Sequence, residues 1–167
     1  MATYKDYNPS KMNDYMTPDY VWDWIIPYIP KDRVIWEAFY GDGESGKYLQ
    51  SKGFEVIHEN IDFFENNKGD IVVSNPPFEY KKEVINRLVQ LDKPFILIMP
   101  VSTLCYNYTK IAKEGLQIII PKKRIKFKRY DKKTNTIYKD WEKDNTAFDC
   151  LFYCYKMNLS KDIIFLE

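Results

Sequence analysis

The residue types best suited to chemistry in this chain lie in one short segment, Asn75-Pro76-Pro77-Phe78. It directly follows residues 70–74, an apolar run typical of a buried parallel strand. Prolines fix φ and lack a backbone donor, so this pair should hold the loop after the strand in one extended shape. An amide, a carbonyl and an aromatic face at the carboxyl end of a strand suit a flat, amino-bearing heterocycle better than a sugar or a phosphate. An adenine turned out of a nucleic-acid strand is such a ligand.

A second candidate is the glycine-bearing turn 37–46, which follows the first predicted strand. Gly41 and Gly43 would let a ligand lie against the backbone, and Glu37 would face a positively charged group, such as the sulfonium of a methionine-derived cofactor. Glycines after a first strand also serve other nucleotide-binding folds and ordinary tight turns. The turn alone therefore does not distinguish a cofactor-binding loop from an ordinary tight turn.

Three further candidates follow the second predicted strand. Glu59 lies at its end, where an acidic residue commonly accepts hydrogen bonds from ribose hydroxyls. Asp62 and Phe63 could bind the amino group of an adenine and cover its ring. A solvated surface glutamate, and a helix cap followed by a core residue, are the alternatives for these positions.

Apolar periodicity and turn residues predict the elements that position these groups. Thr17 as N-cap and Pro18 at the first position begin a helix that ends near Pro27. Strands are expected at 33–39, 54–59, 70–74, 94–101 and 116–120, and helices up to Leu49, at 82–91 and at 102–113. Because strands and helices alternate, the sheet should be parallel and the fold α/β.

The last third of the chain has a different sequence pattern. Residues 124–128 alternate charged and apolar side chains as an edge strand does, 129–146 read as a polar loop able to contact a substrate, and 147–156 form a strand. Periodicity leaves the final ten residues open between a strand and an ordered tail. We find no internal repeat and no linker, so residues 1–167 should form a single domain with a polar N-terminal tail at 1–16.

Composition sets limits on the partners. The 25 Lys and Arg residues nearly balance the 24 Asp and Glu residues, so a surface that binds nucleic acid must be local. Eight basic residues and one acidic residue lie between Lys122 and Lys133, and our candidates for backbone contacts are Lys122, Lys123, Arg124, Lys126, Lys128 and Arg129. The alternative is a solvated edge strand whose lysines discourage aggregation.

Cysteine and histidine content argues against metal and disulfide chemistry. Cys105, Cys150 and Cys154 are odd in number and lack CxxC spacing, and His58 is the single histidine, so we expect no zinc site and reduced thiols. No apolar run has the length of a membrane span, and the N-terminus lacks the apolar stretch of a signal peptide. The expected location is intracellular, in the cytoplasm, without secretion.

Taken together, these motifs resemble the S-adenosylmethionine-dependent N(6)-adenine methyltransferases. That family is marked by an [Asn/Asp/Ser]-Pro-Pro-[aromatic] motif after the fourth strand and by a Gly-containing loop after the first. The resemblance implies a Rossmann-like class I methyltransferase fold, a mostly parallel twisted sheet with helices on both faces. It assigns catalysis to Asn75, Pro76, Pro77 and Phe78, and binding of S-adenosylmethionine to Thr17, Pro18, Glu37, Phe39, Gly41, Gly43, Glu59, Asp62 and Phe63.

The chain departs from the family pattern in three respects. Glu37 stands where aspartate is commoner. The short spacing between Glu59 and Asp70 leaves little room for a further strand and helix, so the sheet should be trimmed at that edge. A separate recognition domain is not expected, which suggests a minimal catalytic domain.

The implied reaction is methylation of the 6-amino group of adenine in nucleic acid, with DNA favoured over RNA. Two alternatives stay open: methylation of a glutamine amide in a protein, and a non-catalytic methyltransferase-like subunit that binds nucleic acid. A homodimer or a targeting partner protein also remains open.

Overall fold

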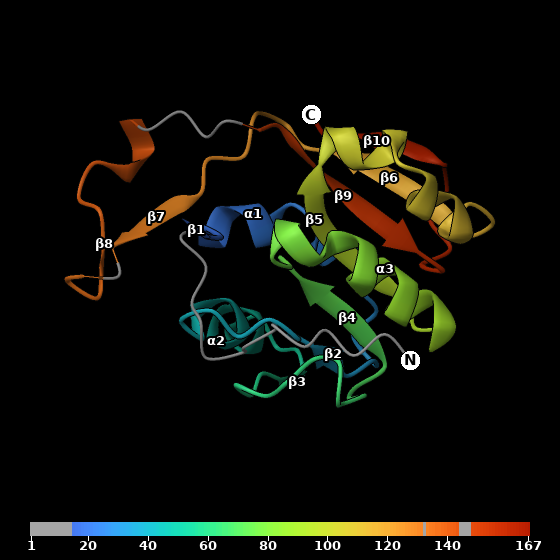
Figure 1. Cartoon of the computed structure of the whole chain (residues 1–167), viewed down its shortest axis with the longest axis horizontal. Helices are drawn as coiled ribbons and strands as arrows, with labels where there is room; N and C mark the ends of the chain where they lie inside the picture. The colour runs from blue at the N-terminus through green and yellow to red at the C-terminus, as the bar shows by residue number, and fades with distance from the viewer. Residues whose placement is uncertain (1–14, 132, 144–147) are drawn as a thin grey trace.

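A seven-stranded sheet forms the centre of the molecule. The computed structural model describes residues 15–131, 133–143 and 148–167. The strand order is β10-β6-β9-β5-β4-β2-β3 (Figure 1). The bounds are β2 (Ile35–Trp36), β3 (Val56–Ile57), β4 (Ile71–Ser74), β5 (Phe95–Pro100), β6 (Leu116–Ile120), β9 (Cys150–Tyr155) and β10 (Ile163–Phe165). β9 runs antiparallel to both of its neighbours, and the other pairings in this sheet are parallel. The predicted, mostly parallel α/β sheet is confirmed.

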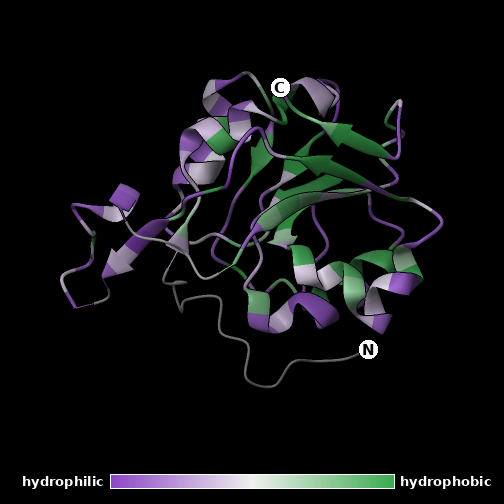
Figure 2. Ribbon diagram, turned by 90° about the horizontal axis from the view of Figure 1, so that it is seen from above, coloured by the Kyte–Doolittle hydropathy of each residue, from purple (hydrophilic) through white to green (hydrophobic). Residues whose placement is uncertain are grey.

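Successive residues of the central strands enter two separate cores. In β5, Ile96 and Ile98 pack into one core, whereas Leu97 and Met99 pack into the other. This alternation follows from the period of two of a strand, and it requires apolar side chains at every position. Figure 2 accordingly shows the central strands as the most hydrophobic part of the ribbon.

Helices cover both faces of the sheet, as the resemblance implied. The first core contains residues of α1 (Asp19–Asp23) and α2 (Glu44–Ser51), and the second contains residues of α3 (Lys81–Gln90). Short 3₁₀ helices are η1 (Ile26–Tyr28), η2 (Phe78–Tyr80), η3 (Val101–Cys105) and η4 (Asn107–Ala112). The predicted helix at 102–113 is therefore wrong in type. No described helix is both long and apolar enough to cross a membrane.

The sheet is trimmed where the sequence predicted it. β3 is the edge strand, and 58–70 contains neither helix nor strand. Two buried cations hold this segment. Arg87 of α3 donates from Nε to the Phe63 carbonyl at 3.0 Å and from Nη2 to the Asn66 carbonyl at 2.7 Å. Lys93 donates to the carbonyl of Lys68 at 3.1 Å, and burial lowers its pKa.

A second, three-stranded sheet lies beside the central one. Its order is β1-β7-β8, with bounds β1 (Tyr15–Met16), β7 (Lys128–Asp131) and β8 (Thr136–Ile137). We call residues 126–143, apart from 132, the arm; it ends in η5 (Trp141–Lys143) and projects from the body in Figure 1. The prediction of a loop at 129–146 is wrong for the residues of β7, β8 and η5 in this range. Residues 144–147 and 1–14 lie outside the described residues.

The predicted edge strand at 124–128 is also wrong in its bounds, because β7 begins only at Lys128. The alternation that suggested it is real: Ile125 and Phe127 are buried, whereas Arg124 and Lys126 are exposed. The alternation therefore predicted the burial of these side chains correctly, although residues 124–127 do not belong to a strand.

Candidate active site

Three parallel strands end at the same edge of the sheet and place the candidate residues there. Glu37 follows β2, Glu59 lies two residues after β3, and Asn75 directly follows β4. The Glu37 amide still donates to the Ile57 carbonyl at 2.9 Å, which keeps the ends of β2 and β3 together. Carboxyl ends of parallel strands are where α/β folds bind ligands.

The Asn75 side chain is held on one side and free to accept on the other. Its Nδ2 donates to Thr17 Oγ1 at 3.1 Å. Its Oδ1 is buried and has no hydrogen-bond partner among the residues that the structure describes. Buried acceptors are rarely left unpaired, because desolvation without a partner costs about 1–3 kcal/mol. An incoming donor would satisfy this oxygen.

Thr17 reaches Asn75 because it does not cap a helix. The structure makes Pro18 the N-cap of α1, with no side-chain capping bond, so the prediction of Thr17 as N-cap is wrong. Thr17 is buried and follows β1, whose pairing with β7 fixes its position. This hydrogen bond joins the segment before the first central strand to the loop after β4.

Aromatic contacts fix the orientation of Phe78, which is half-buried at the start of η2. The ring of Phe148 lies edge-on to it, with centroids 5.0 Å apart, and Phe127 lies edge-on at 6.4 Å. The loop is also closed by the Tyr80 amide, which donates to the Pro77 carbonyl at 3.0 Å. Sequence reasoning missed both partner rings; the apolar Phe127 between two lysines, Lys126 and Lys128, was the available signal.

Glu37 is an almost completely buried carboxyl group, with 2% of its surface exposed. Its Oε1 accepts hydrogen bonds from the Ser74 hydroxyl and, at 3.4 Å, from the Phe39 amide. Burial raises the pKa of Glu37 from 4.5 to about 8, although these two bonds act in the opposite direction. Ser74 was not predicted as a site residue. It directly precedes Asn75, and its hydrogen bond therefore links Glu37 to the end of β4.

The glycine turn brings the start of α2 to the end of β2. Gly41 and Gly43 have φ of +59° and +81°, and Gly43 is the N-cap of α2. Gly46 allows a still closer approach, since a Cβ there would lie 2.3 Å from Cγ of His58. The His58 ring in turn stacks on Tyr40 at a centroid distance of 6.0 Å. The side chains of Met16, Tyr40 and His58 lie close to where Cβ atoms of Gly41, Gly43 and Gly46 would stand, so these glycines allow the turn to pack closely.

The other predicted cofactor residues divide between surface and core. Glu59 is exposed beyond β3, whereas Asp62 Oδ1 accepts from the Phe64 amide at 2.7 Å. Phe63 is fully buried against Trp36 and Phe39, with centroids 5.4 and 4.8 Å away. Phe63 therefore packs in the core beneath the site and has no exposed face for a ligand. This agrees with the alternative interpretation of Phe63 as a core residue.

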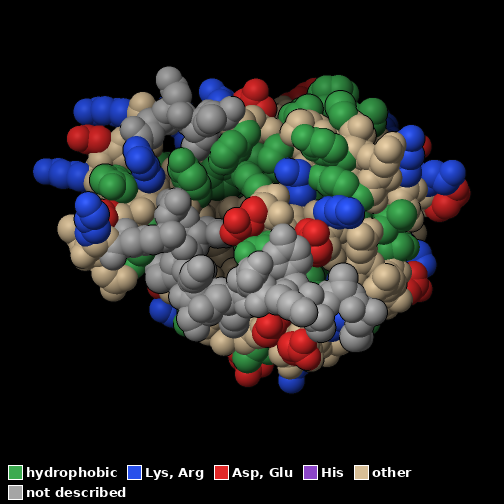
Figure 3. Space-filling view, viewed as in Figure 1, with side chains coloured by type: hydrophobic (Ala, Val, Ile, Leu, Met, Phe, Trp, Pro, Cys, Tyr) green, Lys and Arg blue, Asp and Glu red, His purple; other side chains and the backbone are tan. Residues whose placement is uncertain are grey.

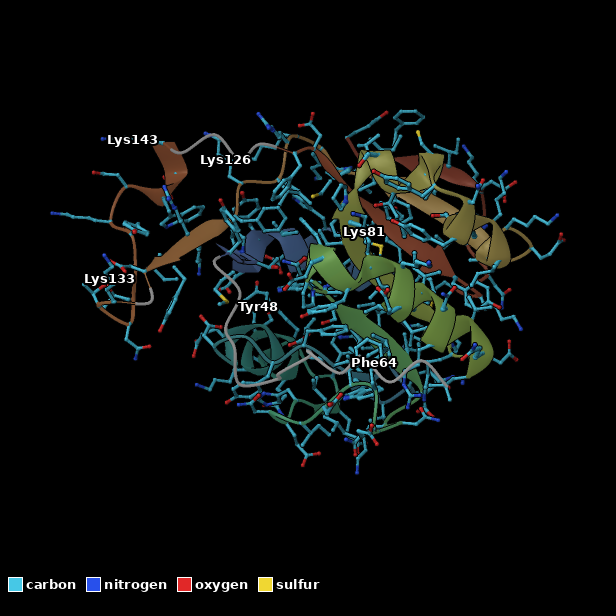
Figure 4. All side chains as sticks on the ribbon, in the orientation of Figure 1. Tyr48, Phe64, Lys81, Lys126, Lys133 and Lys143 are labelled. Carbon is cyan, nitrogen blue, oxygen red and sulfur yellow. The ribbon has the colours of Figure 1, made fainter. Side chains whose placement is uncertain are left out.

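The predicted nucleic-acid contacts lie at the base of the arm and along it. Lys122, Lys123, Arg124, Lys126 and Arg129 are exposed, and Lys128 is half-buried. Lys126 Nζ donates to the Glu142 carbonyl at 2.8 Å, and the Arg129 guanidinium lies 5.0 Å from the centroid of the Tyr138 ring. Figure 3 shows Lys and Arg side chains spread over the arm, and Figure 4 shows Lys126, Lys133 and Lys143 there.

The donor set fits an organic cation better than a metal ion. Within the described ranges, no three His, Cys, Asp or Glu side chains come together to hold a metal. Glu37 offers a buried carboxyl group, and Glu59 offers an exposed one after the next strand. Carboxyl groups at the ends of neighbouring parallel strands suit an organic ligand that carries a cation and hydroxyl groups.

The sheet with an antiparallel β9 between β5 and β6, covered by helices on both faces, defines the Rossmann-like fold of methyltransferases. Residues 43–145 match the family model described as adenine-specific methyltransferase EcoRI, and the chain belongs to this family. It is also similar to the type II methyltransferase M.EcoRI of Escherichia coli, with 33% identity over 76 residues, which make up 46% of this chain. The aligned part spans 20% of that relative.

The comparison with solved structures gives two matches. A dimethyladenosine transferase from Plasmodium falciparum matches with a TM-score of 0.50 and 12% identity, covering 84% of this chain and 62% of that chain. A methyltransferase from Pyrococcus furiosus has a TM-score of 0.42 and 13% identity, covering 90% and 87%. The first of these likenesses shows the fold alone.

Proposed function

We propose that this protein transfers a methyl group from S-adenosylmethionine to the exocyclic 6-amino group of adenine in nucleic acid, with DNA as the favoured substrate. The observation that carries the proposal is the buried Oδ1 of Asn75, which has no hydrogen-bond partner in the described part of the chain, three positions before Phe78, whose ring packs against Phe148. Membership of an adenine-specific methyltransferase family supports it.

Asn75 and Pro76 would act on the amino group itself. The nitrogen of an adenine amino group is a poor nucleophile, because its lone pair is delocalised into the ring. Acceptance of its two hydrogens by Asn75 Oδ1 and the Pro76 carbonyl favours the tetrahedral geometry in which the lone pair is free. The same acceptors stabilise positive charge as it develops on the nitrogen.

Phe78 and Thr17 would position the reacting groups. Phe78 stacks on the extruded base, and its orientation is already fixed by Phe148 and Phe127. Thr17 holds the Asn75 amide so that its oxygen, and not its nitrogen, faces the base. Fixed acceptors need no reorganisation during the reaction, which is the main source of their effect.

Glu37, Ser74 and the glycine turn would bind the cofactor, which supplies an electrophilic methyl group on its sulfonium. Glu37 pairs with the positively charged amino-acid part, and Ser74 orients its carboxylate. Glu59 accepts hydrogen bonds from the ribose hydroxyls. Gly41 and Gly43, both with positive φ, shape the turn along which the cofactor would lie.

The test is methyl transfer from labelled S-adenosylmethionine to matched pools of double-stranded DNA, single-stranded DNA, RNA and protein. The proposal predicts label in nucleic acid, recovered after digestion as N(6)-methyladenine. Label in glutamine of the protein pool, or no label in any pool despite cofactor binding, would overturn it. Lys161→Glu, at an exposed position distant in sequence from the site residues, should remain active and is the control for substitutions of the site residues.

A further inference from the structure

The 3₁₀ segment after β5 exposes an unusual group of apolar side chains. Val101, Leu104, Tyr106 and Ile111 are between 42% and 48% exposed. The segment is nevertheless firmly held: Thr109 Oγ1 donates to the Thr103 carbonyl at 2.6 Å, and the Tyr153 hydroxyl donates to the Pro100 carbonyl at 2.6 Å. Figure 3 shows apolar side chains gathered over this part of the surface.

Tyr106 has the surroundings of a stacking site. Its ring lies nearly parallel to that of Tyr108, at 9° and a centroid distance of 5.4 Å, so Tyr108 supports it from one side. Nζ of Lys81 lies 5.5 Å from the centroid of the Tyr106 ring. A half-exposed aromatic ring that is backed by a second ring and has a cation near its face can bind an unpaired base and its phosphate.

This pair adjoins the candidate active site. Lys81 is the first residue of α3 and comes three positions after Phe78. Tyr106 follows β5, whose carboxyl end lies next to that of β4 because the two strands are parallel neighbours. In Figure 1 the arm and the η3–η4 segment lie on opposite sides of the turn from β4 to α3, and Figure 4 labels Lys81 on α3.

We propose that Tyr106 stacks on an unpaired nucleobase next to the target adenine, and that Lys81 binds the phosphate of that nucleotide. The inference rests on the proposed function and narrows its substrate. A base in a duplex is paired and stacked, so a ring such as Tyr106 must disrupt these interactions to stack fully on it, whereas a single strand offers such a base without this cost. The favoured substrate is therefore a single strand or an unpaired region.

The test is direct binding of fluorescent single-stranded oligonucleotides, with 2-aminopurine next to a single adenine, measured without any methyl donor. Tyr106→Ala should weaken binding about tenfold and remove the quenching of 2-aminopurine, whereas Tyr106→Phe should retain both. Lys81→Ala should weaken binding and lower its dependence on salt. Ile111→Ala, at a similarly exposed apolar position of the same segment, is the matched control and should bind like the wild type.

Wild-type affinity and quenching in Tyr106→Ala would overturn the inference. So would an equal loss with Ile111→Ala accompanied by loss of self-association in sedimentation, which would make the patch a protein interface. The same experiments distinguish a failure of the proposed function. A wild-type protein that binds the oligonucleotide and quenches 2-aminopurine but never methylates adenine would have this binding site without the proposed activity. Methylation of single strands with an unchanged KM in Tyr106→Ala would overturn the inference alone.

Discussion

A hydrogen bond of 3.1 Å joins Asn75 to Thr17, two residues that are 58 positions apart in the chain. It uses the amide nitrogen of Asn75, whereas the buried amide oxygen has no hydrogen-bond partner among the described residues. The loop after β4 thus depends for its orientation on a residue that lies before the first strand of the central sheet.

Thr17→Val should lower the rate of methyl transfer about tenfold while leaving the unfolding temperature nearly unchanged. Valine has the shape of threonine but cannot accept the hydrogen bond, so the Asn75 amide loses its fixed orientation. Single-turnover kinetics with saturating cofactor measure this effect. Thr17→Ser retains the hydroxyl and is the control; an equal loss in both variants would show that packing, and not the hydrogen bond, matters.

Affinity for S-adenosylmethionine should rise with pH until the pH reaches about 8. Burial holds the pKa of Glu37 near 8 in the free protein, and a cationic cofactor requires the carboxylate. Below that pH, affinity should fall by up to about tenfold for each pH unit. Calorimetric titration across this range checks the slope. Glu37→Gln should bind weakly and without this pH dependence; a wild-type affinity that does not vary with pH would contradict the role of Glu37.

The same pKa shift should affect stability. Because the folded protein holds this proton with a pKa of about 8 and the unfolded chain with one of 4.5, the free energy of unfolding should decrease as the pH rises between these values. Denaturant titrations near pH 5 and near pH 8 would show it, by a few kcal/mol at most. Glu37→Gln should remove this part of the decrease, since glutamine does not titrate.

How far the sequence predicted the structure depended on whether the signal was local. The apolar run at 71–74 and the two prolines correctly placed β4 and the loop after it, because each acts through its own residues. The pairing of Tyr15 with Arg129 was missed, since neither β1 nor β7 has a pattern that distinguishes it without its partner. The same holds for Ser74 and Phe148, whose roles depend on contacts distant in sequence.

Arg87→Ala should destabilise the fold by about 3 kcal/mol, because it removes the donors to two carbonyls of the segment between β3 and β4. Chemical denaturation measures the change. Lys82→Ala, at an exposed position of the same helix, should stay within about 0.5 kcal/mol of the wild type. Equal stability of the two variants would mean that the buried guanidinium does not hold this segment.

Reversal of charge on the arm should weaken nucleic-acid binding without regard to sequence. Lys126→Glu combined with Lys128→Glu should reduce affinity for all oligonucleotides alike, lower the salt dependence and leave cofactor affinity intact. The matched control reverses two exposed lysines outside the arm, Lys113→Glu with Lys161→Glu. Unchanged affinity in the arm variant would mean that these lysines are solvated surface residues without a role in nucleic-acid binding.

The central claim is that Asn75 Oδ1 accepts a hydrogen of the adenine amino group, and the single-turnover rate of Asn75→Ala tests it most directly. We expect the rate of label transfer to an adenine-containing strand to fall by about 100-fold or more, with cofactor affinity little changed. The wild-type product should be N(6)-methyladenine. A variant that methylates adenine at the wild-type rate, or a wild-type product labelled at another base, would contradict the account.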